Sequence, residues 1–101
     1  MVYHIVMWQF KEEIEEARKP ELKAAMAEHL CGLVGQVPGL LSAKFVDHPI
    51  PSSTHDMALV TTFEKAENIA GYSGHPAHQN VANTYVRPFV HNRSCLDFET
   101  E

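Results

Sequence analysis

The sequence has 101 residues and a mass of 11.4 kDa, which is about the size of one domain. Hydrophobic residues make up 45% of the chain and charged residues 21%, and this globular composition excludes a disordered or fibrous protein. Eight Lys and Arg against thirteen Asp and Glu give a formal net charge of −5, which argues against a nucleic acid or an anionic membrane as partner, because both require clustered cations. We therefore expect a single acidic domain over residues 1–101.

The sequence shows no sign of export or of membrane insertion. Its longest apolar runs, such as residues 57–60, are far shorter than the ~20 residues of a transmembrane helix. The first ten residues lack the basic start and the cleavage site of a secretory signal. Cys31 and Cys95 show neither metal-binding nor redox spacing, so we expect reduced, partly buried thiols in a cytoplasmic protein.

The first half of the chain predicts three strands and one helix. Residues 2–10 are rich in β-branched and aromatic side chains and predict a strand that is apolar on both faces. Apolar residues then recur at intervals of three and four from Pro20 to about Val37, which predicts a helix that Pro38 and Gly39 end. Strands are predicted over residues 40–47 and 56–64, on either side of a polar loop broken by prolines.

The second half predicts two helices and a last strand. A short helix over residues 65–73 is broken at Gly74, and Pro76 begins a second helix that runs to about Val90. Residues 94–98 predict the final strand. The order strand, helix, strand, strand, helix pair, strand is the ferredoxin-like split β-α-β pattern. We predict an α+β fold with a four-stranded antiparallel sheet and helices on one face.

The two-faced strands also predict self-association. Residues 2–10 and 56–64 are largely apolar on both faces, while helices on one side of the sheet cover only one of them. A second copy of the same sheet is the simplest cover for the other face. We predict a homodimer that forms through the sheet faces.

Five segments resemble a known family. The longer two are residues 2–11, VYHIVMWQFK, and residues 72–78, YSGHPAH; the others are residues 37–39, 56–60 and 86–89. In this order, across nearly the whole chain, they resemble the stress-responsive A/B barrel family. The resemblance implies a dimeric α+β barrel. Members of that family include stress-associated plant proteins, proteins without known activity, and proteins similar to polyketide cyclases that close a ring by an aldol-type condensation.

Tyr72, His78 and His4 are the candidate catalytic residues. Pro76 places His78 in the first turn of a helix, where the partial positive charge of the helix end disfavours an imidazolium and favours a neutral base. His4 shares a strand face with Val6 and Trp8. A base, a second histidine and a phenol suit proton abstraction next to a carbonyl, with Tyr72 donating a hydrogen bond to the enolate.

The resemblance to cyclase-like members covers this candidate site in part. His4, Tyr72 and His78 match the pocket histidines and tyrosine of those proteins. Leu30 stands where a tyrosine would be and Met57 where a histidine would be, so the resemblance implies a more apolar pocket. We expect the ligand pocket to include Val6, Trp8, Leu30, Met57 and His75.

Other chemistry and other functions remain open. His4, His75 and His78 would supply three imidazoles for zinc or nickel, but Pro76 directs His75 elsewhere and we assign no metal site. Some members resemble cation binders that use backbone carbonyls, here around residues 33–40. No nucleotide or phosphate motif is present, so we expect no cofactor. The sequence favours a protein that binds a small organic ligand, with cofactor-free, cyclase-like proton transfer; the alternative is a non-catalytic stress-associated or structural protein.

Overall fold

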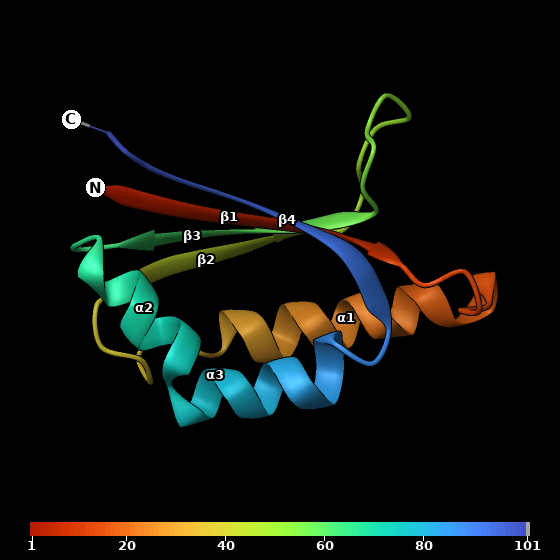
Figure 1. Ribbon diagram of the computed structural model, residues 1–101. Coiled ribbons are helices and arrows are strands. Elements are labelled where there is room, and N and C mark those ends of the chain that lie inside the picture. Colours follow the sequence, from red (N-terminus) through yellow and green to blue (C-terminus); the bar gives the residue numbers. More distant parts are fainter. Residues whose placement is uncertain (101) are drawn as a thin grey trace.

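The computed structural model describes residues 1–100, and its strands form one antiparallel sheet in the order β2-β3-β1-β4. The helices lie on one face of this sheet (Figure 1), so the predicted ferredoxin-like α+β fold is confirmed. Within residues 1–100, no helix combines the length and the apolar character needed to cross a membrane. In chain order the elements are β1 (Val2–Phe10), the 3-10 turn η1 (Glu16–Arg18), α1 (Lys19–Cys31), β2 (Leu40–Val46), β3 (Met57–Phe63), α2 (Glu67–Gly74), α3 (Pro76–Val81), the π-helical turn η2 (Ala82–Val86) and β4 (Val90–Glu99).

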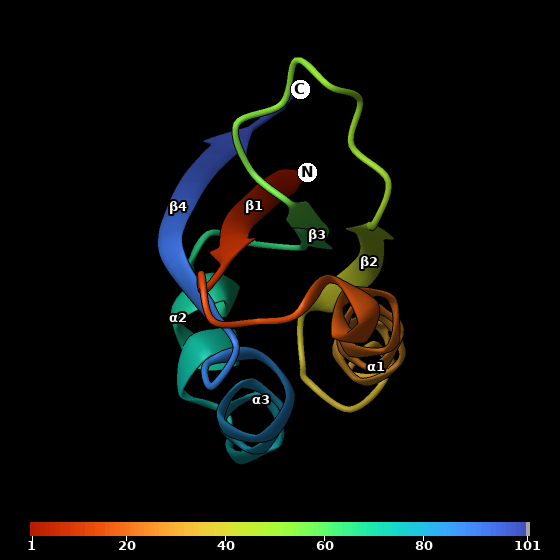
Figure 2. The ribbon, with the colours of Figure 1, turned by 90° about the vertical axis from the view of Figure 1, so that its right-hand side faces the viewer.

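The hydrophobic core is formed by side chains of the sheet and of the helices that lie below it in Figure 2. Every second residue of β1, starting at Val2, is buried, because these side chains point toward the helices. Leu22, Met26 and Leu30 of α1 recur at intervals of four and pack against them. Phe63 of β3 is fully buried at the centre. The periodic residues of the sequence therefore form one layer of core that fixes the helices on the sheet.

The other face of the sheet is apolar and only partly covered. Tyr3, Ile5 and Met7 of β1 are half-buried, while Leu96 and Phe98 of β4 are exposed. The rings of Tyr3 and Phe98 stack with their centroids 5.0 Å apart. Both faces of β1 are therefore apolar, as predicted, and the outer one lacks a cover within a single chain. Figure 2 shows the loop between β2 and β3 rising on the same side, opposite the helices.

Helix boundaries differ from the prediction in two places. The helix expected to reach Val37 ends at Cys31, with Gly32 as its C-terminal cap. Residues 32–36 then form turns, and among them Gly35 has a φ of 91°, which favours glycine. Leu33 and Val37 are still buried, since the turns keep them over the core. The helix expected to reach Val90 changes at Val81 into the π-helical turn η2, where the N–H of Arg87 donates to the carbonyl of Ala82 at 2.8 Å.

The last strand is longer than predicted, because it begins at Val90 rather than at Ser94. Its polar start, with Asn92 and Arg93, hides the strand in the sequence. The pairing of β1 with β4 shifts between Met7 and Gln9, and Asn92 has a φ of 51°. This is a β-bulge, which bends a strand and can redirect its side chains. Figure 2 shows β4 curving toward the helices.

Candidate functional site

A cavity of about 200 Å³ lies between the sheet and the helices. Strands β1 and β3, helix α1 and the turn η2 form its apolar wall, while α2, α3 and β4 contribute most of the polar groups. The apolar lining residues are Val6, Trp8, Leu30, Leu59, Ala82 and Val86, and the polar ones are His4, Tyr72, Ser73, His78, Gln79, Arg87 and Arg93. An apolar cavity with a few convergent polar groups is the usual form of a small-molecule site.

The structure brings the three candidate catalytic residues together in this cavity. His4, Tyr72 and His78 all line it, and so do Val6, Trp8 and Leu30 of the predicted pocket. The centroid of the Tyr72 ring lies 4.3 Å from that of His78 and 6.2 Å from that of His4. His4 of β1 therefore meets Tyr72 of α2 and His78 of α3 although it is far from both in the sequence.

Two residues of the predicted pocket lie elsewhere, which corrects that prediction. The Nδ1 atom of His75 accepts a hydrogen bond from the N–H of Ala77 at 3.1 Å, so its side chain caps α3. Met57 pairs with Trp8 at the end of β3 nearest the loop. Leu59, two residues further along β3 on the same face, lines the cavity instead of Met57.

His78 is held in a form that exposes a basic nitrogen. Its Nδ1 atom lies 3.2 Å from the carbonyl oxygen of Ser73, to which an N–H at this position donates. Nε2 is then the nitrogen that carries the lone pair of a neutral imidazole. Burial is the largest cause that lowers the pKa of His78 below 6.5, and the charges of Arg87, His4 and Arg93 act in the same direction, whereas the hydrogen bond to Ser73 opposes them. The sequence predicted the neutral form but attributed it to the helix end.

Tyr72 is a buried residue that lines the cavity and whose hydroxyl is free to bind a ligand. The residue is 2% exposed, yet within residues 1–100 its hydroxyl makes no hydrogen bond to another group. Burial raises the pKa of Tyr72 to about 12, with a smaller contribution from Cys31. The phenol therefore keeps its proton over the physiological range and can donate it as a hydrogen bond into the cavity.

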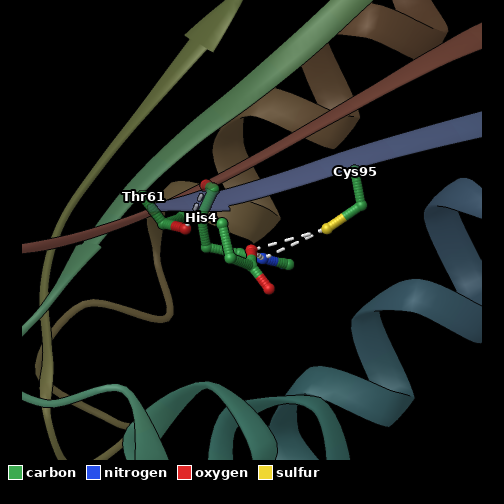
Figure 3. A network of polar contacts seen from close by, with 4 residues as sticks. His4, Thr61 and Cys95 are labelled. Atoms are coloured by element: carbon green, nitrogen blue, oxygen red, sulfur yellow. Dashed lines mark hydrogen bonds and ion pairs between the residues drawn. The ribbon is translucent and has the colours of Figure 1, made fainter. Parts of the chain in front are cut away.

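Two side chains of the last strand, β4, hold His4 in place, and the sequence did not predict these contacts. Its Nδ1 atom contacts a carboxylate oxygen of Asp97 and lies 3.6 Å from the sulfur of Cys95 (Figure 3). Asp97 stands directly opposite His4 in the register of β1 and β4. Burial raises the pKa of Asp97, but the hydrogen bond and the charge of His4 outweigh it and lower the pKa overall. The sequence did hold a signal for this contact: Cys95 and Asp97 are two residues apart in the predicted last strand, so their side chains point to the same face of the sheet.

The same three residues form the one group in residues 1–100 whose donor atoms could hold a metal ion. A nitrogen of His4, the sulfur of Cys95 and an oxygen of Asp97 lie within 4.8 Å of one another. These are ligand types that zinc accepts. The set considered from the sequence, His4 with His75 and His78, does not come together in this part of the chain.

The fold and the cavity define a ferredoxin-like α+β protein with room for a small molecule, and the chain belongs to the Stress responsive A/B Barrel Domain family, whose sequence profile it matches over residues 2–100. It is 29% identical to olivetolic acid cyclase of Cannabis sativa over 84 residues, which cover 83% of this chain and 82% of that protein.

Solved structures show the same fold. A dimeric protein of unknown function and ferredoxin-like fold from Bacteroides fragilis superposes with a TM-score of 0.88 at 20% identity, covering 98% of this chain and 95% of the other. The hydroxynitrile lyase of Passiflora edulis superposes with a TM-score of 0.69 at 17% identity, covering 96% of this chain and 90% of the other.

Proposed function

We propose that this protein binds a small organic carbonyl compound in the cavity and moves a proton at the carbon next to the carbonyl, without a cofactor. The observation that carries the proposal is the unpartnered hydroxyl of Tyr72, a residue that lines the cavity with its ring 4.3 Å from that of His78. A positioned base beside a hydrogen-bond donor is the arrangement that enolate formation requires.

The chemistry follows from the two side chains. Nε2 of His78 takes a proton from the carbon next to the carbonyl, and the electrons of the broken C–H bond move to the carbonyl oxygen. The hydroxyl of Tyr72 donates a hydrogen bond to the negative charge on this oxygen. The enolate carbon then either takes a proton back from His78 or attacks a second carbonyl of the ligand. The second outcome forms a carbon–carbon bond: the electrons of the attacked C=O move to its oxygen, and this oxygen takes the proton from His78, as in an aldol-type ring closure.

His4 completes the polar end of the cavity. The carboxylate of Asp97 holds its Nδ1 side, which fixes the ring orientation and leaves Nε2 for the ligand. The similarity to a protein named as a cyclase and to one named as a lyase supports chemistry on a small organic molecule. Leu30, Leu59 and Val86 leave most of the wall apolar, which suits a hydrocarbon part of the ligand.

We also propose that two copies pair through the outer faces of their sheets. Half-buried Tyr3, Ile5 and Met7 form the centre of that face, and exposed Leu96 and Phe98 extend it. Contiguous apolar surface of this kind is typical of an interface. The structural relative from Bacteroides fragilis is dimeric, which supports self-association of this chain as well.

Deuterium exchange tests the proposed proton transfer without knowledge of the natural substrate. In D₂O, the protein should speed the exchange of the hydrogens next to the carbonyl of 2-heptanone above the rate in buffer alone, measured by ¹H NMR. Exchange at the buffer rate, with 2-heptanone at concentrations that saturate binding, would contradict the proposal. That result would favour either a cavity that binds a ligand without catalysis or lining residues with a purely structural role.

The pH dependence of this exchange follows from the two shifted pKa values. Because the pKa of His78 lies below 6.5, the base is neutral at about pH 7, and the catalysed rate should fall only as the pH drops through that lowered pKa. Because the pKa of Tyr72 is about 12, the rate should not fall between about pH 7 and pH 10. A rate that declines in this alkaline range, after correction for exchange in buffer, would argue against Tyr72 as the donor.

A further inference from the structure

Two of the three arginines of this acidic chain line the cavity. They are Arg87, at the end of η2, and Arg93, in β4. Both side chains belong to exposed residues, so they lie where the cavity meets solvent. Neither forms an ion pair with a carboxylate within residues 1–100, whereas Arg18 is paired with Glu21. The cavity therefore has two positive charges at its mouth that no carboxylate of the described chain neutralises by direct contact.

Neutral groups hold Arg87 in place. Its Nη1 atom donates to the side-chain oxygens of Asn83 at 2.6 Å and of Gln79 at 3.0 Å. Gln79 in turn donates to the carbonyl of Ser73, the same carbonyl that His78 contacts. Amide oxygens orient the guanidinium without cancelling its charge. This leaves its other N–H groups for an acceptor, and the carboxylate is the acceptor that arginine matches best in geometry.

Regular alternation along β4 points Arg93 toward the cavity, because Cys95 and Asp97, two and four residues further on, stand opposite Val6 and His4 on the helix side of the sheet. Pairing shifts between Met7 and Gln9, so that Trp8 stands opposite both Asn92 and Arg93. Trp8 points to the helix side of the sheet, and Arg93 lines the same cavity. The carboxylate of Asp97, on the same strand, is paired with His4 rather than with Arg93. The side chain of Arg93 is thus directed at the ligand site, and the bulge begins only beyond it, at Asn92.

We propose that the ligand of this cavity is a small carboxylate, with its anionic group held between Arg87 and Arg93 and its apolar body against Val6, Leu30 and Leu59. This inference rests on the proposed function and specifies its substrate class. The volume of about 200 Å³ corresponds to roughly seven groups of the size of a water molecule, so the apolar part is short. An acyl chain of about six carbons matches that space.

Hexanoate and hexanamide form a matched pair of probes, because they differ in charge and hardly in shape. Trp8 is the only tryptophan of the chain and lines the cavity, so its fluorescence reports binding of either compound. We expect hexanoate to bind the native protein about tenfold more tightly than hexanamide at low salt, and the advantage to shrink as salt is added. Arg87→Gln and Arg93→Gln should each weaken hexanoate binding by about three- to tenfold and leave hexanamide unchanged.

Arg18→Gln is the control, because Arg18 lies outside the cavity lining and is exposed. It removes the same charge from the chain and should change neither affinity. Equal binding of hexanoate and hexanamide would overturn the inference about the carboxylate while leaving the small-molecule site in place. Failure of both compounds to bind at millimolar concentration would overturn this inference and count against the proposed function as well. An equal loss of hexanoate affinity in Arg18→Gln would show a general charge effect and would also overturn it.

Discussion

His78→Ala is expected to lower the catalysed exchange of 2-heptanone by about 10²–10⁴-fold, the usual contribution of a positioned base. The fold should survive, because His78 is only half-buried and its single hydrogen bond goes to the backbone carbonyl of Ser73. Tyr72→Phe should also reduce the rate. It should barely change thermal stability, since the hydroxyl that it removes has no partner within residues 1–100.

His48→Ala provides the matched control for this experiment. Its side chain is 91% exposed in the loop between β2 and β3, far from the cavity lining. It should leave both the exchange rate and the melting temperature unchanged. If His78→Ala instead lowers the free energy of unfolding by roughly 1–3 kcal/mol and leaves the exchange rate unaltered, His78 has a structural role and its assignment as the base is wrong.

Ile5→Lys is expected to separate the two copies of the proposed dimer. Ile5 lies at the centre of the outer face, paired with Val60 on one side and Leu96 on the other. A lysine there would place an unpaired charge between two apolar sheets, at a cost of several kcal/mol. Light scattering at micromolar concentration should give twice 11.4 kDa for the native protein and a mass near 11.4 kDa for the variant.

Val34→Lys is the comparison for the dimer experiment. Val34 is an exposed apolar residue in the turns after α1, away from the sheet, so the same change in charge should leave the mass unchanged. A native protein that is monomeric at micromolar concentration would contradict the sheet-to-sheet dimer directly. A dimer that survives Ile5→Lys would place its interface on another surface.

Periodicity was enough to predict the fold, because it records which face of each element is buried. Leu22, Met26 and Leu30 marked α1, and the two-faced pattern of residues 2–10 marked β1. Boundaries were missed where local geometry overrides pattern. Gly35 turns the chain before Val37, and the bulge at Asn92 allows a polar segment to continue as a strand. Neither effect leaves a periodic signal.

The candidate site was only partly predictable for a similar reason. Tyr72 and His78 stand only six residues apart, on either side of the break between α2 and α3, so they could be grouped from the sequence. The place of His4 beside them depends on how the sheet packs against the helices. Asp97 and the two arginines required the register of β4 and the course of η2. Strand register cannot be read from the sequence, so only the structure showed that these residues belong to the site.

The measurement that tests the central claim most directly is a titration of the ¹⁵N-labelled protein with 2-heptanone, followed by ¹H–¹⁵N correlation NMR. If the cavity between the sheet and the helices is the site, the signals that shift should be those of residues around it, including the indole of Trp8 and the amides of Leu59, Tyr72 and His78. Signals of the outer face, such as the amide of Leu96, should stay in place. Shifts confined to the outer face, or no shifts at saturating ligand, would contradict the account.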